Sequence, residues 1–227
     1  YWWAQLGSFS DDYRVISIDI AGHGESGRNR DDYSMGKFGD DVVAVMNHAN
    51  IENAFLIGHS MGGPVALEAA VKLNNRVKAI IGVDTFHNIA RGPASPFLRL
   101  VINTMFRIRQ GSSTEDAVEK QFREDANQIL KDWVSNKAET TDSRASRGSL
   151  SSIISMDYPS QLKKIDIPIL TLNSKFWMET DLDGGKKEYP GYEVDFVDEV
   201  GHYVMMEKPS YFNNWLENVL ESFLATQ

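Results

Sequence analysis

Residues 54–63 read Ala-Phe-Leu-Ile-Gly-His-Ser-Met-Gly-Gly, and they carry the clearest indication of architecture in this sequence. The first four residues are an apolar run without alternation, which is typical of a strand buried on both faces of a parallel sheet. Small and apolar residues over 62–73 predict a buried helix directly after it. A Gly-x-Ser-x-Gly sequence between a strand and a helix predicts a nucleophile elbow, a tight turn that exposes the hydroxyl of Ser60. We expect glycine at 58 and 62 because the turn crowds the backbone.

The segments around this turn alternate between strand and helix patterns. Residues 77–83 predict a second strand, so 54–57, 62–73 and 77–83 form a strand–helix–strand unit with parallel strands. The same reasoning predicts further strands at 13–19, 167–172 and 192–197, and helices at 36–49, after an N-cap at Ser34, and beyond Pro209.

The strand pattern disappears between the 77–83 and 167–172 segments. Amphipathic helices are predicted there at 97–109, 114–138 and 143–156. We therefore expect one α/β domain built from residues 1–86 and 158–227, with a helical cap inserted over 87–157. The large apolar residues of this insertion could belong to a core or to a substrate pocket; they are Phe97, Leu98, Met105, Phe106, Phe122 and Trp133.

Composition excludes several classes of function. The 227 residues carry a formal net charge of −9 and contain no cysteine. A disulfide framework, a cysteine–zinc site and a cysteine nucleophile are therefore excluded, and a broad basic surface for nucleic acid is not expected. No apolar run approaches the roughly 18 residues of a membrane span.

The start of the chain and its glycosylation pattern bear on location. Residues 1–6, Tyr-Trp-Trp-Ala-Gln-Leu, read like the middle of a helix and lack an initiator methionine, so we expect that upstream residues are missing. The sequence holds no Asn-x-Ser/Thr acceptor, which favours a cytoplasmic setting.

A serine nucleophile needs a base, and the chain offers five histidines. His202 follows the last predicted strand, at the same edge of a parallel sheet as Ser60, and is the preferred base. His87 follows the 77–83 strand and is the competing candidate. His48 is expected to face solvent, His23 belongs to a glycine turn, and His59 is expected to line the site. The N–H of Met61, at the start of the following helix, is the expected oxyanion donor.

Three motifs together resemble the α/β-hydrolase superfamily over nearly the whole chain. They are the elbow, the turn Asp19-x-x-Gly-His-Gly-Glu-Ser26, and the closing Gly201-His202 with Glu207-Lys208-Pro209. The resemblance implies a mostly parallel central sheet with flanking helices, a helical cap, and esterase- or lipase-like activity without a cofactor or metal. Its order of nucleophile, acid and histidine fits Ser60 before His202. It also implies a second oxyanion donor from a His-Gly loop upstream, which this sequence does not contain.

The acid of the triad departs from that family. Most members place it after the strand equivalent to 167–172, where this chain reads Asn-Ser-Lys-Phe-Trp over 173–177. Asp84 is the best replacement because it ends the strand beside the elbow strand, a position that some members use. The alternatives are Asp181 or Asp183, then Asp198, which lies too near His202 in sequence, or a serine–histidine dyad with no acid.

A rival motif suggests a dinucleotide-dependent reductase. Gly22-x-Gly24-x-x-Gly27 matches the dinucleotide fingerprint by letter, but that fingerprint requires a helix to start within it. The residues that follow, 28–32, are charged and predict a solvated loop, so we do not favour this interpretation.

The sequence therefore predicts a serine hydrolase that cleaves a small, largely apolar carboxylic ester through Ser60, His202 and Asp84. His59, Trp177 and Met205 are the expected pocket residues. A ligand-binding or receptor-like protein with little turnover remains an alternative, as do a lactonase, a C–C hydrolase and a cofactor-free oxygenase on the same fold.

Overall fold

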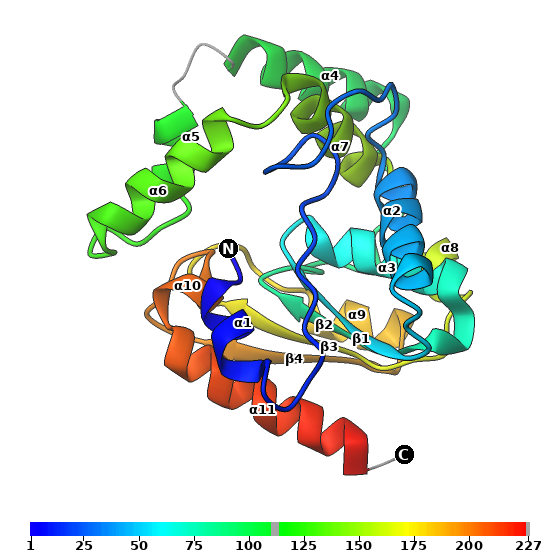
Figure 1. Cartoon of the computed structure of the whole chain (residues 1–227). Coiled ribbons are helices and arrows are strands. Elements are labelled where there is room, and N and C mark those ends of the chain that lie inside the picture. The colour runs from blue at the N-terminus through cyan, green and yellow to red at the C-terminus, as the bar shows by residue number, and fades with distance from the viewer. Residues whose placement is uncertain (110–113, 226–227) are drawn as a thin grey trace.

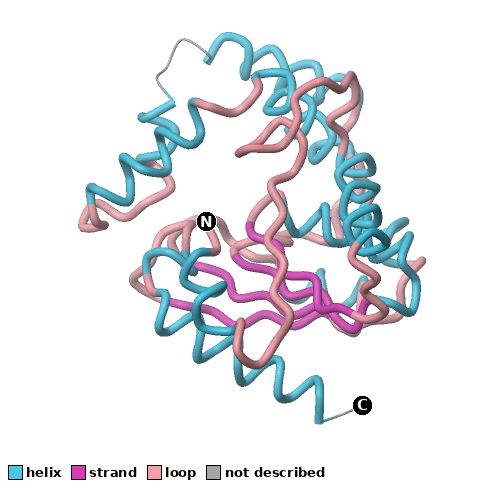
Figure 2. The backbone as a smooth tube through the Cα atoms, viewed as in Figure 1, coloured by secondary structure: helices cyan, strands magenta, loops and turns pink. Residues whose placement is uncertain are grey.

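A parallel four-stranded sheet forms the centre of the computed structural model, which describes residues 1–109 and 114–225 (Figures 1 and 2). The strands lie side by side in chain order: β1 (Ala54–His59), β2 (Val77–Val83), β3 (Ile169–Ser174) and β4 (Tyr192–Val197). Every neighbouring pair is parallel. The carboxyl ends of all four strands therefore meet at one edge, which is where α/β proteins build their sites.

Helices connect and cover these strands. Their bounds are α1 (Trp3–Phe9), α2 (Met35–His48), α3 (Gly62–Leu73), the 3₁₀ helix η1 (Asn74–Arg76), α4 (Pro96–Arg109), α5 (Thr114–Glu119), α6 (Gln128–Glu139), α7 (Ser143–Ser155), α8 (Tyr158–Leu162), α9 (Leu182–Glu188), α10 (Val204–Glu207) and α11 (Pro209–Ala225). The predicted helices at 36–49 and 62–73 and the predicted parallel unit are confirmed. The hydroxyl of Ser34 accepts the N–H of Lys37 and caps α2.

Two apolar clusters cover the two faces of the sheet. Side chains alternate across a strand, so Ile80 of β2 packs with α2 and α3 while its neighbour Ile81 packs with α10 and α11. Figure 1 shows the same arrangement, with α1 and α11 on one side of the sheet and α2 and α3 on the other. The result is a three-layer α/β fold with a parallel central sheet, as predicted.

Helices α4–α7 fall between β2 and β3 in the chain and lie above the sheet in Figure 1 as two pairs, α4 with α7 and α5 with α6. The expected single helix over 114–138 is wrong, because α5 and α6 are separate helices. The chain turns between them, and Asn127 starts α6 by accepting the N–H of Ile129 on its side chain. The exposed apolar residues of this group include Phe97 and Ile129. The side chains of Met105 and Phe106 lie outside the described residues.

The strand predicted at 13–19 is also wrong. This segment is extended but pairs with no strand among the residues that the structure describes, and Val15 and Ile16 are exposed. A β-branched run becomes a strand only where a neighbour accepts its hydrogen bonds. Because the 13–19 segment does not pair with it, β1 is the edge of the described sheet. It is therefore not buried on both faces, and its Ile57 is exposed.

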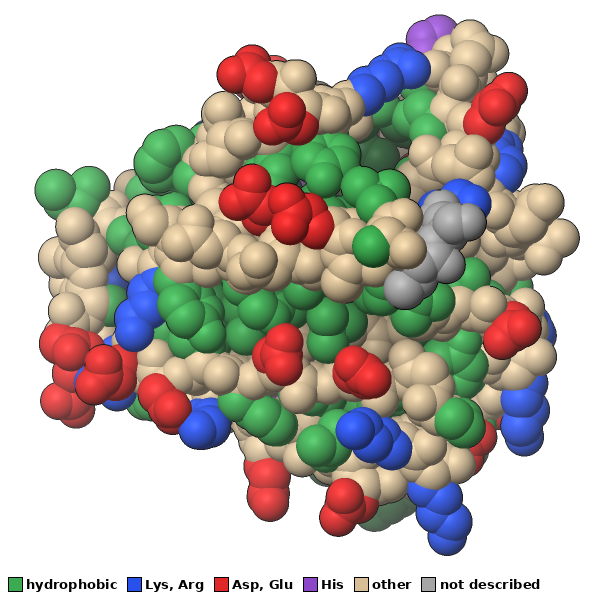
Figure 3. Space-filling view, turned by 90° about the horizontal axis from the view of Figure 1, so that it is seen from below, with side chains coloured by type: hydrophobic (Ala, Val, Ile, Leu, Met, Phe, Trp, Pro, Cys, Tyr) green, Lys and Arg blue, Asp and Glu red, His purple; other side chains and the backbone are tan. Residues whose placement is uncertain are grey.

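The surface carries mixed charge. On the face shown in Figure 3, apolar side chains lie in broken bands between interspersed acidic and basic side chains. Within 1–109 and 114–225, no helix is long and apolar enough to cross a membrane.

Candidate active site

Ser60 sits in strained backbone between β1 and α3. Its φ is 51°, in the left-handed region that a residue with a side chain rarely adopts. The turn is held on both sides, since the N–H of Ser60 donates to the carbonyl of Val83 (3.0 Å) and its carbonyl accepts the hydroxyl of Thr85 (2.7 Å). Strain of this kind persists only where the surroundings enforce it, and it is concentrated at functional sites.

The glycines around Ser60 differ in how much space surrounds them. A Cβ on Gly58 would overlap the carbonyl of Gly62, and a Cβ on Gly63 would come within 2.7 Å of the Cγ2 of Thr85. A Cβ on Gly62 would meet nothing within 4 Å. The expectation that crowding requires both flanking glycines is therefore right for Gly58 and wrong for Gly62.

Asp84 and His202 are in direct contact. Oδ2 of Asp84 lies 2.5 Å from Nδ1 of His202, and both side chains are buried. The other carboxylate oxygen, Oδ1, accepts the N–H of Ser174 at 2.8 Å. Asp84 also has a positive φ, 45°, directly after β2. The carboxylate can therefore fix the imidazole so that its Nδ1 carries the proton and its Nε2 can accept one.

Burial controls the charge of this pair. It raises the pKa of Asp84 to about 7, against the opposing effects of His87 and of the N–H of Ser174. Burial, with a smaller contribution from His87, lowers the pKa of His202 to about 3. The imidazole is therefore neutral at neutral pH, as a general base must be.

The loop that carries His202 is held by a segment that follows α5. The carbonyl of Gln121 accepts the N–H of His202 at 2.7 Å, and the side-chain oxygen of Gln121 accepts the hydroxyl of Tyr203 at 2.8 Å. Phe122 stacks on Tyr203 with ring centroids 4.7 Å apart. Glu207 completes the loop by accepting the N–H groups of Gly201 and Tyr203.

His59 joins the elbow to this loop. Its Nε2 lies 2.9 Å from the carbonyl oxygen of His202, to which it donates, and the two imidazole rings are 4.5 Å apart. Burial keeps the pKa of His59 well below its usual value. Trp177 lies against His202, and the centroids of the two rings are 4.9 Å apart. Met205 is fully buried in the apolar cluster around α11, and its pocket role stays a prediction.

Of the remaining predicted residues, Met61 lies next to Ser60, whereas the three other aspartates lie away from His202. Met61 is the N-cap of α3, next to Ser60. Asp181 is the exposed N-cap of α9, where it accepts the N–H of Gly184, and Asp183 is exposed in the first turn of α9. Asp198 is exposed and pairs with Lys175 at 2.9 Å. None of these three carboxylates is seen to contact His202 in the described part of the chain.

The rival dinucleotide geometry is not formed. No helix begins between Gly22 and Gly27, and α2 starts only at Met35. The carboxylate of Asp19 instead accepts the N–H of Glu25 at 3.0 Å and closes this turn on itself. His23, in the same turn, is close to the carbonyl of Ala21.

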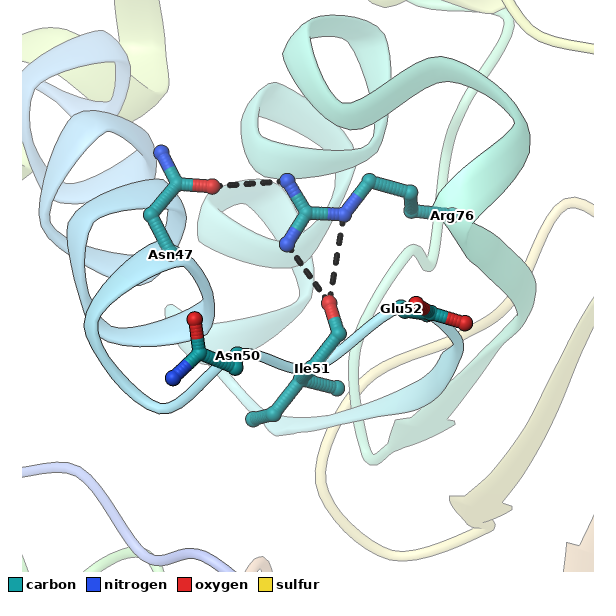
Figure 4. Close-up of a pocket in the computed structure, with 5 residues that line it drawn as sticks. All are labelled: Asn47, Asn50, Ile51, Glu52 and Arg76. Carbon is teal, nitrogen blue, oxygen red and sulfur yellow. Dashed lines mark hydrogen bonds between the residues drawn. The ribbon is translucent and has the colours of Figure 1, made fainter.

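A depression at the other end of β1 is a structural feature (Figure 4). Its lining residues are Asn47, Asn50, Ile51, Glu52 and Arg76. The guanidinium of Arg76 bonds the side chain of Asn47 (2.7 Å) and the carbonyl of Ile51 (2.6 Å), and so ties η1 to the end of α2. In the described part of the chain, no group of three His, Asp or Glu residues is placed to hold a metal ion.

Sequence reasoning missed the residues that hold His202. Gln121 and Phe122 belong to the segment between α5 and α6, and no motif marks them. His87 was considered only as a base, yet its Nε2 lies 3.8 Å from Oδ1 of Asp84.

Comparison with known proteins identifies the family and supports the fold. The sequence model of the alpha/beta hydrolase fold family matches residues 1–176. A 3-oxoadipate enol-lactonase from Acinetobacter baylyi is 26% identical over 226 residues, 98% of this chain and 84% of that protein. A thermophilic esterase from Thermogutta terrifontis superposes with a TM-score of 0.81 at 22% identity, covering 98% of this chain and 85% of that one. An enol-lactonase from Burkholderia xenovorans gives a TM-score of 0.77 at 20% identity, covering 99% and 85%.

Proposed function

The chain belongs to the alpha/beta hydrolase fold family, and within that family we propose that it is a serine hydrolase acting on small, largely apolar carboxylic esters. Ser60 is the nucleophile, His202 the general base and Asp84 the acid that orients it. The observation that carries this proposal is the 2.5 Å contact between Asp84 and His202. His202 lies on a loop that is bound by the imidazole of His59, the residue before Ser60.

The reaction is acyl transfer to water. Nε2 of His202 takes the hydroxyl proton of Ser60 as its oxygen attacks the ester carbonyl, and the N–H of Met61 stabilises the oxyanion. His202 returns the proton to the alcohol as the ester bond breaks, which leaves Ser60 acylated. Water, deprotonated by His202, then attacks this acyl group, and the released Ser60 regains its proton.

The surroundings of the base support an apolar substrate. Trp177 lies against the His202 ring, and Phe176 and Met178 beside it in the sequence are exposed. The Trp133 ring of α6 is partly exposed above Tyr1, 5.6 Å away. These groups favour an uncharged acyl or alcohol portion.

Hydrolysis of p-nitrophenyl butyrate tests the proposal. The wild-type protein should release p-nitrophenol with saturable kinetics, and Ser60→Ala should lower kcat by about 10⁴ or more while the circular dichroism spectrum is unchanged. Saturable binding of the ester without product would favour the ligand-binding alternative.

A lactone is the second candidate substrate. The enol-lactonase of Acinetobacter baylyi aligns with 98% of this chain, and a lactone is a cyclic ester that the same residues would open. In that case the leaving alcohol stays attached to the acyl group until water releases it. Parallel assays with γ-lactones and linear esters of equal carbon number separate the two substrates.

A further inference from the structure

His87 is an almost buried histidine beside Asp84 that the proposed mechanism does not use. Its side chain is 9% exposed, and its Nε2 lies 3.8 Å from Oδ1 of Asp84. This Nε2 is buried and has no hydrogen-bond partner among the described residues. A buried polar atom left in this way destabilises the fold, so its approach to a carboxylate calls for a reason.

The amide of Asn173 establishes the direction of the hydrogen bonds around His87. Its Oδ1 accepts the N–H of Thr85 (3.2 Å), a group that can only donate. Its Nδ2 donates to the carbonyl of Thr85 (3.1 Å), a group that can only accept. The orientation of the amide is therefore unambiguous, and the contact of Nδ2 with Oγ1 of Thr180 (3.0 Å) is a donation to that hydroxyl.

The hydroxyl of Thr180 determines which nitrogen of His87 carries the proton. Because its oxygen accepts from Asn173, its own hydroxyl proton is free to donate to Nδ1 of His87, 3.0 Å away. Nδ2 of Asn173 also lies 3.4 Å from the same nitrogen, but its two hydrogens already go to Thr85 and Thr180. The hydroxyl of Thr180 is therefore the donor that faces Nδ1 and makes it an acceptor, so the proton of the neutral ring is on Nε2 and faces Asp84.

We infer that His87 is a positioning residue, whose Nε2–H favours the ionised form of Asp84 from the side of Oδ1 while His202 occupies Oδ2. The inference rests on the proposed function of Asp84. A bond dipole 3.8 Å from a carboxylate is a significant interaction in a buried site, where water does not screen it. One network of side chains then runs from Asn173 through Thr180, His87 and Asp84 to the base, His202, and each contact in it has a fixed direction.

The other charged groups around His87 do not replace this effect. Asp84 and His202 are the titratable groups of the network, and Asn173 and Thr180 are uncharged. Asp181 lies next, where its N–H donates to the carbonyl of His87 (2.8 Å), but its carboxylate turns away to cap α9. His87 lowers the pKa values of both Asp84 and His202, so its loss should move both titrations to higher pH.

The experiment compares His87→Leu with His87→Gln. The pH profile of kcat/KM for p-nitrophenyl butyrate is measured for each, together with wild type and the exposed control His48→Leu. His87→Leu should shift the acid limb upward by about one pH unit, with a preserved plateau at high pH. His87→Gln, whose amide N–H can take the place of Nε2, should restore the wild-type limb. An unshifted limb in His87→Leu would overturn the inference.

A second variant and a second readout keep the test independent of turnover. Thr180→Val removes the donor to Nδ1 and should shift the limb upward in the same direction as His87→Leu, although His87 is retained. In ¹⁵N-histidine NMR spectra, the His202 titration of Ser60→Ala carrying His87→Leu should lie about one unit above that of Ser60→Ala alone. If the wild type proves inactive, the proposed function fails, whereas this titration still supports or contradicts the role of His87.

Discussion

Nδ1 of His202 lies 2.5 Å from Oδ2 of Asp84, although 118 residues separate the two in sequence. Asp84 directly follows β2 and His202 follows β4, so the parallel sheet brings both to its carboxyl edge, where Ser60 follows β1. All three depend on backbone that carries strain: φ is positive at Ser60, at Asp84, and at Glu199 in the His202 loop.

Asp84→Asn should lower kcat for p-nitrophenyl butyrate by about 10⁴ without unfolding the protein. The amide would present an N–H to Nδ1 and so favour the imidazole tautomer that cannot accept the serine proton. Asp181→Asn and Asp183→Asn are matched controls on exposed carboxylates of α9 and should retain wild-type turnover. A variant at Asp84 with near wild-type kcat would remove this carboxylate from the mechanism.

The activity should depend on pH through the same pair. The working form has Asp84 ionised and His202 neutral. Burial raises the pKa of Asp84 to about 7, so the ionised form is populated above this pH and lost as the pH falls through it. We therefore expect kcat/KM to rise about tenfold per pH unit below pH 7 and to level off above it. A profile that is flat from pH 5 to 8 would contradict this assignment.

The contact between Gln121 and the His202 loop should matter for turnover. Tyr203→Phe removes the hydroxyl that bonds Gln121, and we expect a loss of about 1 kcal/mol in the free energy of unfolding. Because the loop is then less well positioned, kcat should fall about tenfold. Tyr189→Phe is the control, since its hydroxyl donates to the carbonyl of Ile167 and accepts the N–H of the same residue, far from the site. It should lose at least as much stability as Tyr203→Phe, with no change in kcat; equal kcat in both variants would show that the contact of Tyr203 is only structural.

Two alanine substitutions test the geometry of the elbow. Gly58→Ala should destabilise the fold by about 1–3 kcal/mol and abolish activity, because the new methyl group overlaps the carbonyl of Gly62. Gly62→Ala has open space and should change the free energy of unfolding by less than about 1 kcal/mol in either direction. Chemical denaturation of both variants measures the difference. Equal destabilisation would mean that the turn is packed otherwise.

The βαβ unit was predictable because local patterns fixed it. The apolar run before Ser60, the small residues over 62–73 and the next apolar run each favour one element, and short connections between them require a parallel pair. The segment 13–19 was not, because whether a β-branched run becomes a strand depends on a neighbour that its own sequence does not specify.

The candidate site divides in the same way. Asp84 follows the strand next to the elbow strand and His202 follows the last strand, so the shared carboxyl edge of a parallel sheet already favoured this pair. The parts of the site that come from outside the sheet could not be predicted. Gln121 and Phe122 reach His202 through the path of an irregular segment, and the direction of the His87 ring depends on Thr180 and Asn173. Contacts of this kind leave no periodic trace in a sequence.

Covalent labelling by a fluorophosphonate ester, with the adduct located by mass spectrometry, tests the central claim most directly. The account predicts a single adduct on Ser60 in the wild-type protein, none in Ser60→Ala, and labelling slowed by about 10²–10⁴ in His202→Gln. A folded wild-type protein that stays unlabelled, or that carries the adduct on another residue, would contradict it.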